Sequence, residues 1–478
     1  MRRRVTFSRN LTLSLSRTCQ CYCKYCAFAT HQAHLYAPDE VVGILDGAVK
    51  RNVKELLVLT GEKPEVNPEV SAKLGEYGHE DFTAYVVWTC ERALERGLLP
   101  HTNLGVLSRE DLGRLREVTA SQGLMLESVS ERLMQTVHAG SPTKHPVRRL
   151  ETIRAAGELR IPFTSGILVG IGETEDERVQ ALETLAAVHG EYGHIQEVIL
   201  QNFVPHQSYY GEEPAEIADA AAREYWRTGV DEDSDGGMAA VRERPELPLP
   251  AWACAVSIGD MKRLIAETRR LMPDVGIQIP PNLADWWGEL VQAGATDLGG
   301  LSANGDHISP EHPFPSPHQV RKELQKDGVA LTERLCVYPR YIDPEWVVQG
   351  VMDTIKLKYW SFIPRRGSGG PPTRTDPPAP IRHDLVAGAI AKGRDGMALS
   401  ADELTALFAE TRREAIEELR EAADELREEL AGETVTFVST ATSTSRTSAR
   451  SAARSAASAR ASARPTPTST TARSSQDG

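Results

Sequence analysis

Four cysteines lie within eight residues near the start of this sequence, and their spacing could bind metal. Cys19, Cys23 and Cys26 form a Cys-x3-Cys-x2-Cys pattern, and Cys21 lies between the first two. Three thiolates on one short loop can hold three irons of a 4Fe–4S cluster, which leaves the fourth iron free to bind a cosubstrate. The pattern therefore predicts a cluster on Cys19, Cys23 and Cys26, with Cys21 as a spare thiol.

A zinc site is the alternative for these cysteines. Structural zinc takes four ligands, usually as two cysteine pairs that are far apart in the sequence. Cys21 could supply a fourth ligand, but no second pair follows, since Cys90, Cys254 and Cys336 are isolated. A disulfide framework is not expected, because the cysteine count of seven is odd and no secretory signal precedes them.

Eight short apolar segments, separated by amphipathic helical patterns, must position these residues. Strands that alternate with helices predict a parallel sheet, and eight such units predict an α/β fold of the (β/α)8 TIM-barrel type. The active site of such a barrel lies at the carboxyl ends of its strands, where the cysteine loop begins. The predicted strands are Leu11–Leu15, Glu55–Thr60, Pro100–Leu104, Leu124–Glu127, Phe163–Val169, Glu197–Phe203, Gly276–Ile279 and Asp297–Leu301.

Composition argues against several classes of protein. The chain has 478 residues and a net charge of −13, which disfavours nucleic-acid binding. No apolar run reaches the roughly 18 residues of a membrane span, so no membrane association is expected. The basic start, Met1-Arg2-Arg3-Arg4, lacks the apolar segment of a secretory signal. We therefore expect a cytoplasmic protein.

Composition also divides the chain into four parts. The barrel is predicted to occupy residues 1–363, with a long acidic segment at 205–255, and a linker rich in Gly and Pro follows at 364–381. Residues 382–438 are predicted to be a helical extension, in which Ser400-Ala401-Asp402-Glu403 caps one long charged helix that ends near Leu430. Residues 439–478 are almost entirely Ser, Thr, Ala and Arg, which predicts a disordered low-complexity tail.

The cysteine pattern, with Tyr25 directly before its last cysteine, resembles the signature of the radical S-adenosylmethionine (radical SAM) superfamily. The resemblance implies two cofactors, a 4Fe–4S cluster and S-adenosyl-L-methionine (SAM). Thr60 stands where the family has the first glycine of a Gly-Gly-Glu region, and 166–173 matches the stretch that packs the adenine. A Gly170→Val side chain is therefore expected to point at the adenine. The residues implied to bind SAM are Tyr25, Gly61, Glu62, Glu127, Gly166, Gly170 and Glu173.

Longer phrases between residues 5 and 345 are similar to one family within this superfamily. Gly97–Asn103 and Tyr192–Phe203 resemble the CofG half of deazaflavin (FO) synthase, the 7,8-didemethyl-8-hydroxy-5-deazariboflavin synthase family. The resemblance implies a lyase of deazaflavin cofactor biosynthesis that forms FO from a 4-hydroxybenzyl ribityl-iminouracil adduct and releases ammonium. It also implies a CofH subunit that supplies the adduct, and an electron donor. The alternatives are a CofH-type tyrosine–uracil radical SAM transferase and a non-catalytic metal-binding scaffold.

Polar residues at the expected barrel mouth are candidates for substrate binding. Amide side chains suit the imide edge of a uracil, and ribityl hydroxyls need several hydrogen bonds. Each candidate could instead be an ordinary strand-end or loop residue, and none is assigned as a general base. The candidates are Arg9, Asn10, Gln201, Asn202, Asn282, Asp306 and His307.

Residues 382–438 resemble the joint that precedes the CofH half in fused synthases. In that family the chain typically continues Val-Asn-Arg-Asn-Ile-Asn-Phe. A GC-rich coding of this phrase, with one base dropped, is translated as Ser-Thr-Ala-Thr-Ser-Thr-Ser, which is the sequence of 439–445. The tail is therefore predicted to be an out-of-frame translation of a former CofH half. The alternative is a genuine low-complexity tail.

Overall fold

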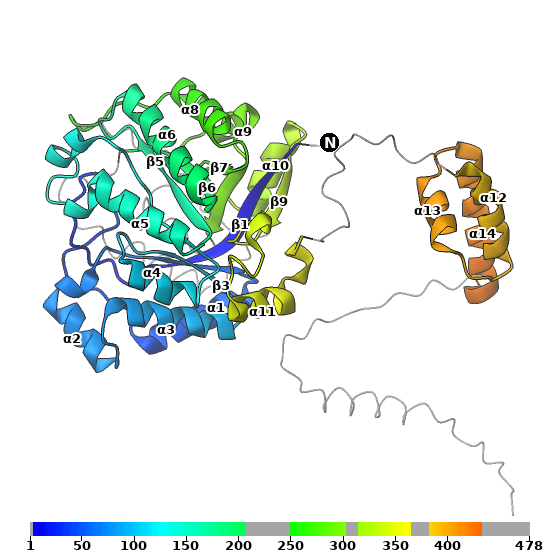
Figure 1. The fold of residues 1–478 in the computed structure, drawn as a ribbon, viewed down its shortest axis with the longest axis horizontal. Helices are drawn as coiled ribbons and strands as arrows, with labels where there is room; N and C mark the ends of the chain where they lie inside the picture. The colour runs from blue at the N-terminus through cyan, green and yellow to red at the C-terminus, as the bar shows by residue number, and fades with distance from the viewer. Residues whose placement is uncertain (1–2, 206–248, 303–313, 365–381, 433–478) are drawn as a thin grey trace, which may run out of the picture. The chain divides into compact units, whose positions relative to one another are not determined.

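A parallel barrel forms the first of two compact units, Met1–Arg366 and Gly367–Gly478, in the computed structural model (Figure 1). The structure describes residues 3–205, 249–302, 314–364 and 382–432. The strands of the first unit are β1 (Arg4–Leu13), β2 (Glu55–Leu59), β3 (Leu99–Asn103), β4 (Ser121–Gly123), β5 (Phe163–Val169), β6 (Ile195–Asn202), β7 (Gly276–Gln278), β8 (Asp297–Ser302) and β9 (Ala330–Arg334).

The long first strand closes the barrel. Its second half pairs with β2, from Asn10 with Glu55 onward, and its middle pairs with β8, up to Asn10 with Ser302. Strands β2 to β8 pair in chain order, so β1 to β8 form a closed ring of eight parallel strands. The predicted (β/α)8 barrel is confirmed. The ninth strand pairs with the first half of β1.

Helices follow the strands and cover the outside of the barrel (Figure 1). In α1, the buried residues Val41, Leu45 and Ala48 recur at helical spacing and face the sheet. The helix α6 begins with a reciprocal capping box between Thr174 and Glu177. The helices of this unit are α1 (Pro38–Lys50), α2 (Pro68–Glu76), α3 (Phe82–Glu95), α4 (Arg109–Arg116), α5 (Pro146–Glu158), α6 (Glu175–Tyr192), α8 (Ile258–Leu271), α9 (Trp287–Ala293), α10 (Pro317–Lys326) and α11 (Gln349–Lys358).

The first, fourth and ninth strands differ most from the sequence prediction. The first strand is Arg4–Leu13 instead of Leu11–Leu15, so it begins seven residues earlier. The fourth strand is Ser121–Gly123, and the predicted segment Leu124–Glu127 lies beyond it. That segment leaves the ladder after Gly123 and returns only for an isolated bridge between Glu127 and Ile167. The strand β9 was not predicted, because its sequence Ala-Leu-Thr-Glu-Arg is short and polar. The fifth strand, Phe163–Val169, has both predicted ends.

The segment after β9 closes the amino-terminal end of the barrel. The carbonyl of Cys336 accepts hydrogen bonds from Ser121 Oγ and Gln196 Nε2, both at 2.9 Å. Around it, Leu99, Leu335, Val337 and further apolar side chains form a separate core. The interior of the barrel is therefore sealed at this end by packed side chains.

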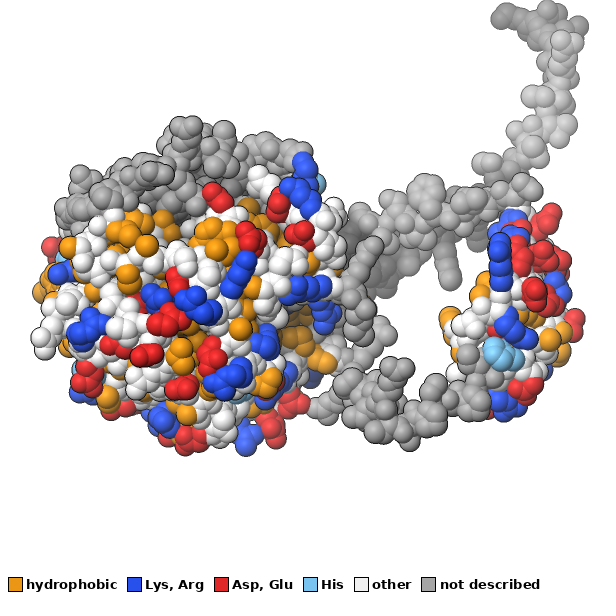
Figure 2. All heavy atoms as spheres, turned by 90° about the horizontal axis from the view of Figure 1, so that it is seen from above, with side chains coloured by type: hydrophobic (Ala, Val, Ile, Leu, Met, Phe, Trp, Pro, Cys, Tyr) orange, Lys and Arg blue, Asp and Glu red, His pale blue; other side chains and the backbone are white. Residues whose placement is uncertain are grey.

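The surface of the barrel mixes charges. On the face drawn in Figure 2, Lys and Arg side chains are interspersed with Asp and Glu side chains. Exposed pairs of this kind contribute little to stability. None of the helices in the described part of the chain is long and apolar enough to cross a membrane.

The second unit contains three described helices, α12 (His383–Arg394), α13 (Ala401–Ala409) and α14 (Arg413–Ala431), around a small apolar core. The single helix predicted from Ser400 to Leu430 is wrong, because the chain breaks at 410–412. The Glu410 carboxylate accepts the backbone N–H groups of Thr411 and Arg412, each at 2.8 Å, and so ends one helix and starts the next. The predicted capping box at Ser400 is confirmed. The predicted tail and most of the predicted linker lie outside the described residues.

Candidate functional site

The cysteine loop lies at the carboxyl end of β1, on the face of the barrel where active sites form. The backbone N–H of Gln20 donates to the carbonyl of Glu62 at 3.0 Å, which attaches the loop to the end of β2. This close approach requires glycine at position 61, because a Cβ on Gly61 would lie 2.1 Å from the carbonyl oxygen of Thr18. The loop is thus fixed by backbone contacts with the neighbouring strand end.

Cys19 and Cys21 differ in their hydrogen bonds. The sulfur of Cys19 accepts the backbone N–H groups of Cys21 at 3.4 Å and Glu62 at 3.2 Å. The Cys21 thiol and these N–H groups together lower the pKa of Cys19. Cys21 is buried, its Sγ lies 3.0 Å from Thr143 Oγ1, and its bond to Cys19 raises its pKa to about 11. The spare role of Cys21 stays a prediction.

Cys23 and Cys26 follow in the same loop and are half-buried. The thiol of Cys23 contacts Ser141 Oγ at 3.4 Å, and its pKa is raised by the Cys21 thiol and by burial. Burial also raises the pKa of Cys26, and the ammonium of Lys144 opposes the rise at both cysteines. Metal binding requires the thiolate, so a positive metal centre would have to supply the charge that these positions lack.

The cysteines fit a polynuclear cluster. Cys19, Cys21, Cys23 and Cys26 line one cavity, together with Tyr25. Within the described residues, no group of three His, Cys, Asp or Glu side chains converges on a single ion. A 4Fe–4S cluster binds each thiolate to a different iron, so it needs separated sulfurs on one wall of a cavity. Several thiols that line one cavity fit such a cluster.

Glu127, which has a strained backbone, lines the same cavity as the cysteines. Glu127 has a left-handed backbone with φ of 65°, which is costly for a residue with a side chain. Its carboxylate accepts from Lys144 Nζ at 2.7 Å and lies 3.7 Å from Arg149. Burial alone would raise the pKa of Glu127, but these two cations outweigh burial and lower it. Strain, burial and ionisation together are typical of a functional residue.

Glu62 and Tyr25 also line the cavity. Glu62 Oε1 accepts from Gln20 Nε2 at 3.2 Å, and Glu62 Oε2 lies 3.9 Å from Arg149 Nη1. This Nη1 atom is buried without a hydrogen-bond partner among the described residues. The Tyr25 hydroxyl lies 3.1 Å from His138 Nε2, which fixes the ring beside the cysteine loop.

The glycine-rich stretch on β5 supports the cavity from outside. Leu168 is the residue of this stretch that lines it. A Cβ on Gly166 would meet the β6 backbone at 2.2 Å, so this glycine allows two strands to pack closely. Glu173 accepts the backbone N–H of Gly170 at 2.6 Å and pairs with Arg178 at 2.6 Å, which orders the turn. The predicted cofactor roles of Gly166, Gly170 and Glu173 stay predictions, with no direct contact implied by this placement.

Replacing Gly170 by valine is expected to weaken SAM binding by about tenfold while the cluster still assembles. Gly170 has a φ of 104°, and its Cβ would lie 2.6 Å from Val256 and 3.3 Å from Phe203, a lining residue. The effect would thus come from a displaced wall and not from a side chain that points at the adenine. Equilibrium dialysis of SAM against reconstituted protein measures it. Gly190→Ala, with open space at its Cβ, is the control. Unchanged SAM affinity in the valine variant would remove this turn from the site.

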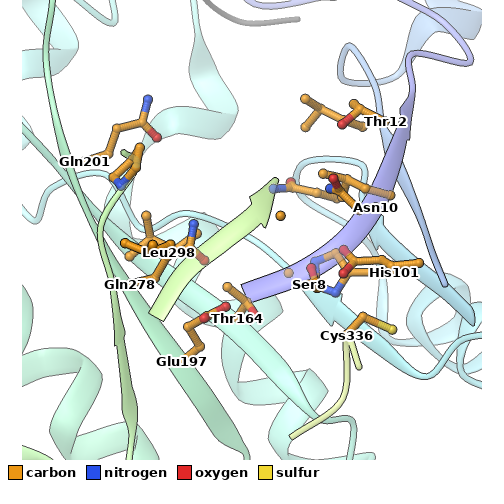
Figure 3. A pocket seen from close by; sticks show the side chains of 18 of the residues that line it. Ser8, Asn10, Thr12, His101, Thr164, Glu197, Gln201, Gln278, Leu298 and Cys336 are labelled. Atoms are coloured by element: carbon orange, nitrogen blue, oxygen red, sulfur yellow. The ribbon is translucent and has the colours of Figure 1, made fainter. Parts of the chain in front are cut away.

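A second cavity fills the interior of the barrel below the first. Three substrate candidates, Asn10, Gln201 and Asn282, line it, and Figure 3 shows Asn10 and Gln201 on opposite sides. Asn202 lines the cysteine cavity instead, where its amide donates to the carbonyl of Leu283 at 3.4 Å. Asn10 and Asn282 therefore line the interior cavity, Asn202 lines the cysteine cavity, and Gln201 lines both.

Of the other three substrate candidates, Arg9 alone belongs to the described residues. Arg9 lies 3.7 Å from Glu333 of β9 and lines neither cavity. Side chains alternate along a strand, so the neighbours of the inward Asn10 point outward. Asp306 and His307 lie outside the described residues.

Sequence reasoning missed several polar residues that line the interior cavity. The alternation along β1 and β3 could have indicated some of them, since Ser8, Asn10 and Thr12 share one face, as do His101 and Asn103. Figure 3 shows Ser8, His101 and Cys336 on one side of the cavity and Glu197, Gln278 and Thr164 on the other. The missed residues are Ser8, Glu55, His101, Glu197, Gln278 and Arg334.

A network of buried charges forms the floor of this cavity. Arg334 donates to both carboxylate oxygens of Asp297, at 2.6 and 2.7 Å, and to Glu197 at 2.8 Å. Glu197 also accepts from the Tyr338 hydroxyl at 2.8 Å. Burial raises the pKa of Glu197 to about 8, since Arg334 opposes the rise only in part and Asp297 adds to it. Glu55 is buried nearby, and burial raises its pKa as well.

Comparison with known proteins shows the family of this chain. Residues 13–185 match the Radical SAM superfamily. A 7,8-didemethyl-8-hydroxy-5-deazariboflavin synthase of Methanothermobacter thermautotrophicus is 38% identical over 364 residues, which cover 75% of this chain and 99% of the relative. A synthase of the same name from Methanoculleus marisnigri is 40% identical over 72% of this chain and 91% of the relative. In fold, the chain is similar to HydG, a maturase of the [FeFe]-hydrogenase, with a TM-score of 0.53, 15% identity, and coverage of 90% of this chain and 79% of that one.

The closed barrel, the cysteine loop at its carboxyl end and the superfamily match define a radical SAM enzyme. This superfamily implies a 4Fe–4S cluster and SAM as cofactors. The similarity to the curated relatives extends over almost their whole length. The chain belongs to the 7,8-didemethyl-8-hydroxy-5-deazariboflavin (FO) synthase family of deazaflavin biosynthesis.

Proposed function

We propose that this chain is the CofG-type lyase that closes the deazaflavin ring of FO. Its substrate is a 4-hydroxybenzyl ribityl-iminouracil adduct, and ammonium is released. The continuity of two cavities is the observation that carries this proposal. The cysteine-lined cavity and the polar interior cavity share five lining residues, so a long substrate can occupy the lower cavity and reach the upper one. These residues are Leu59, Asn103, Met125, Gln201 and Leu283.

The residues of the upper cavity would hold the cofactors. Cys19, Cys23 and Cys26 would bind the cluster, with Tyr25 packed beside them. Gly61 and Glu62 would meet the amino-acid part of SAM, and Glu127 would meet its ribose. When bound, this cofactor pair supplies radical hydrogen abstraction, which is the difficult step of the reaction. The buried walls and the sealed floor would keep water away from it.

Anaerobic reconstitution with iron and sulfide tests the proposed function. The reconstituted protein should show the absorbance of a 4Fe–4S centre, cleave SAM in the presence of a reductant, and form fluorescent FO from the preassembled adduct. A colourless, zinc-loaded protein would indicate the non-catalytic scaffold. SAM cleavage and adduct formation from tyrosine and the ribityl uracil, with no FO, would indicate the CofH-type transferase.

The proposed reaction needs two partners. A CofH subunit would make the adduct, since the described part of this chain contains a single cysteine cluster. A soluble electron donor would reduce the cluster. Omission of either CofH protein or reductant from a coupled assay with tyrosine should prevent FO formation, whereas adduct added directly should remove the need for CofH.

Ending the chain after Val438 is expected to leave FO formation from the adduct unchanged. The barrel is a compact unit of its own, and the site described above lies within it. FO fluorescence per iron–sulfur cluster, compared with that of the full chain, measures the effect. Lost activity with a normal cluster content would show that 439–478 contribute to catalysis.

We also propose that the tail is an out-of-frame translation of a CofH half. Resequencing the gene and translating its other frames past Val438 tests this origin. A second Cys-x3-Cys-x2-Cys pattern within a few tens of codons is expected. Its absence from every frame would favour a genuine low-complexity tail.

A further inference from the structure

One wall of the interior cavity presents hydrogen-bond acceptors, two of which have no donor among the described residues. Asn10, Glu55 and His101 come from the adjacent strands β1, β2 and β3, and all three line the cavity. In the strand register Asn10 lies beside Glu55, and Glu55 lies beside Leu99, two residues before His101. At a rise of about 3.3 Å per residue, the three side chains therefore follow one another along the wall.

The hydrogen bonds of His101 fix the tautomer of its ring. The Ser121 hydroxyl donates its only proton to the carbonyl of Cys336 at 2.9 Å. The same oxygen lies 2.7 Å from His101 Nδ1 and must therefore accept from it. Nδ1 carries the proton, and Nε2 presents a lone pair. Burial and the charge of Arg334 lower the pKa of His101 to about 3, so the ring is neutral and remains an acceptor.

Glu55 and Asn10 add two more acceptors beside the Nε2 atom of His101. Glu55 Oε2 and Asn10 Oδ1 are buried and have no hydrogen-bond partner among the described residues. The amide of Asn10 lies against Gly300, where a Cβ would come within 2.1 Å of Asn10 Nδ2. This glycine therefore lets Asn10 lie flat in the wall. Buried acceptors without donors are unfavourable unless a ligand supplies the donors.

Polar side chains on the opposite side of the cavity floor already hydrogen-bond to one another. Glu197 accepts from Arg334 and Tyr338, each at 2.8 Å. The amide nitrogen of Gln278 lies 3.0 Å from its other oxygen once the amide is oriented to satisfy both atoms. A ligand that enters this cavity thus finds unsatisfied acceptors on the β1–β3 wall. It must offer several donors in a row, and a chain of vicinal hydroxyls does so.

We propose that the wall formed by Asn10, Glu55 and His101 binds the polyol chain of the substrate. The substrate then enters with its ribityl chain first, and its hydroxybenzyl end stays beside the cysteine cavity. This assignment rests on the proposed function and adds an orientation to it. It makes Glu55 and His101 specificity-determining residues that recognise the ribityl chain.

Two fluorescent probes with the same 8-hydroxy-5-deazaflavin ring test this orientation. One carries a ribityl chain, and the other carries a methyl group at the same nitrogen. Dissociation constants are measured by fluorescence anisotropy with the reconstituted full chain. Wild-type protein should bind the ribityl probe about a hundredfold more tightly than the methyl probe, as several hydrogen bonds would provide.

Two lining variants and one matched control separate polyol recognition from general damage. Glu55→Leu and His101→Phe should each weaken binding of the ribityl probe about tenfold and leave the affinity for the methyl probe unchanged. Thr102→Val changes the next residue on β3, which is buried but does not line the cavity, and should change neither probe. Substrate-free SAM cleavage should persist in all three variants, which shows that the barrel and the upper cavity are intact.

The outcomes separate this orientation from the proposed function. Equal weakening of both probes by Glu55→Leu and His101→Phe would show that the wall contacts the ring, and the orientation would be wrong. Unchanged affinity for the ribityl probe in both variants would also overturn it. If wild-type protein binds neither probe and forms no FO, the proposed function fails together with the orientation. FO formation without ribityl preference would overturn the orientation alone.

Discussion

Replacing Cys19, Cys23 or Cys26 by alanine is expected to abolish SAM cleavage. Each of these thiolates would bind a different iron, so the loss of one leaves an incomplete cluster that cannot present an open iron to SAM. Iron and sulfide content, the cluster absorbance and the amount of methionine released from SAM under reducing, anaerobic conditions measure the effect. All three variants should contain less iron than the wild type and cleave SAM only at background level.

Cys21→Ala is the matched control for these variants, because it removes a thiol from the same loop. Cys21 is buried, its Sγ lies against Thr143 Oγ1, and its pKa is raised to about 11. Its variant should retain the cluster and at least part of the activity. An iron-free Cys21→Ala protein, or an iron-replete Cys23→Ala protein, would show that the ligand assignment is wrong.

The sequence predicted the strands that are apolar and buried on both faces. Phe163–Val169 is buried at all seven positions, and its apolar pattern gave both of its ends. Leu124–Glu127 looks like a strand for the same reason, but this segment leaves the ladder after Gly123 and pairs again only at the bridge between Glu127 and Ile167. A pattern of residue types indicates burial, whereas pairing depends on backbone angles that those types do not determine.

The cysteine motif was accessible to sequence reasoning because its residues are close together in the chain. The floor of the interior cavity was not, because it joins Glu55, Glu197, Asp297 and Arg334 from four different strands. In the sequence, each of these four residues looks like an ordinary charged residue of a strand. Alternation indicates which residues share a face, but the closure of the barrel decides which face points inward. This is why Arg9 was predicted at the mouth and His101 was not.

Arg334→Met is expected to destabilise the barrel by about 3–5 kcal/mol, because it leaves buried carboxylates without their cation. Arg334 is 7% exposed, and its partners Asp297 and Glu197 are 0% and 3% exposed. Methionine fills similar volume, so the loss is mainly electrostatic. Urea unfolding, followed by the fluorescence of the barrel, measures the change in the free energy of unfolding.

Arg340→Met is the control for this prediction, since it also removes an arginine from an ion pair. Arg340 pairs with Asp274, and both side chains are about half exposed. Solvent screens such pairs, so the control should change the free energy of unfolding by less than about 1 kcal/mol. Equal effects of the two substitutions would show that the floor network does not depend on Arg334.

The pH dependence of the Arg334→Met variant provides a second test of the same cause. Burial raises the folded pKa of Glu197 from 4.5 to about 8, so between these values the folded state binds more protons than the unfolded state. This contribution to stability is therefore fully present below pH 4.5 and is lost as the pH rises through 8. Removal of Arg334 raises the pKa of Glu197 further, so the free energy of unfolding of the variant should be closest to that of the wild type near pH 5 and furthest from it near pH 8. A deficit that stays constant between these pH values would mean that lost packing, and not uncompensated negative charge, causes the instability.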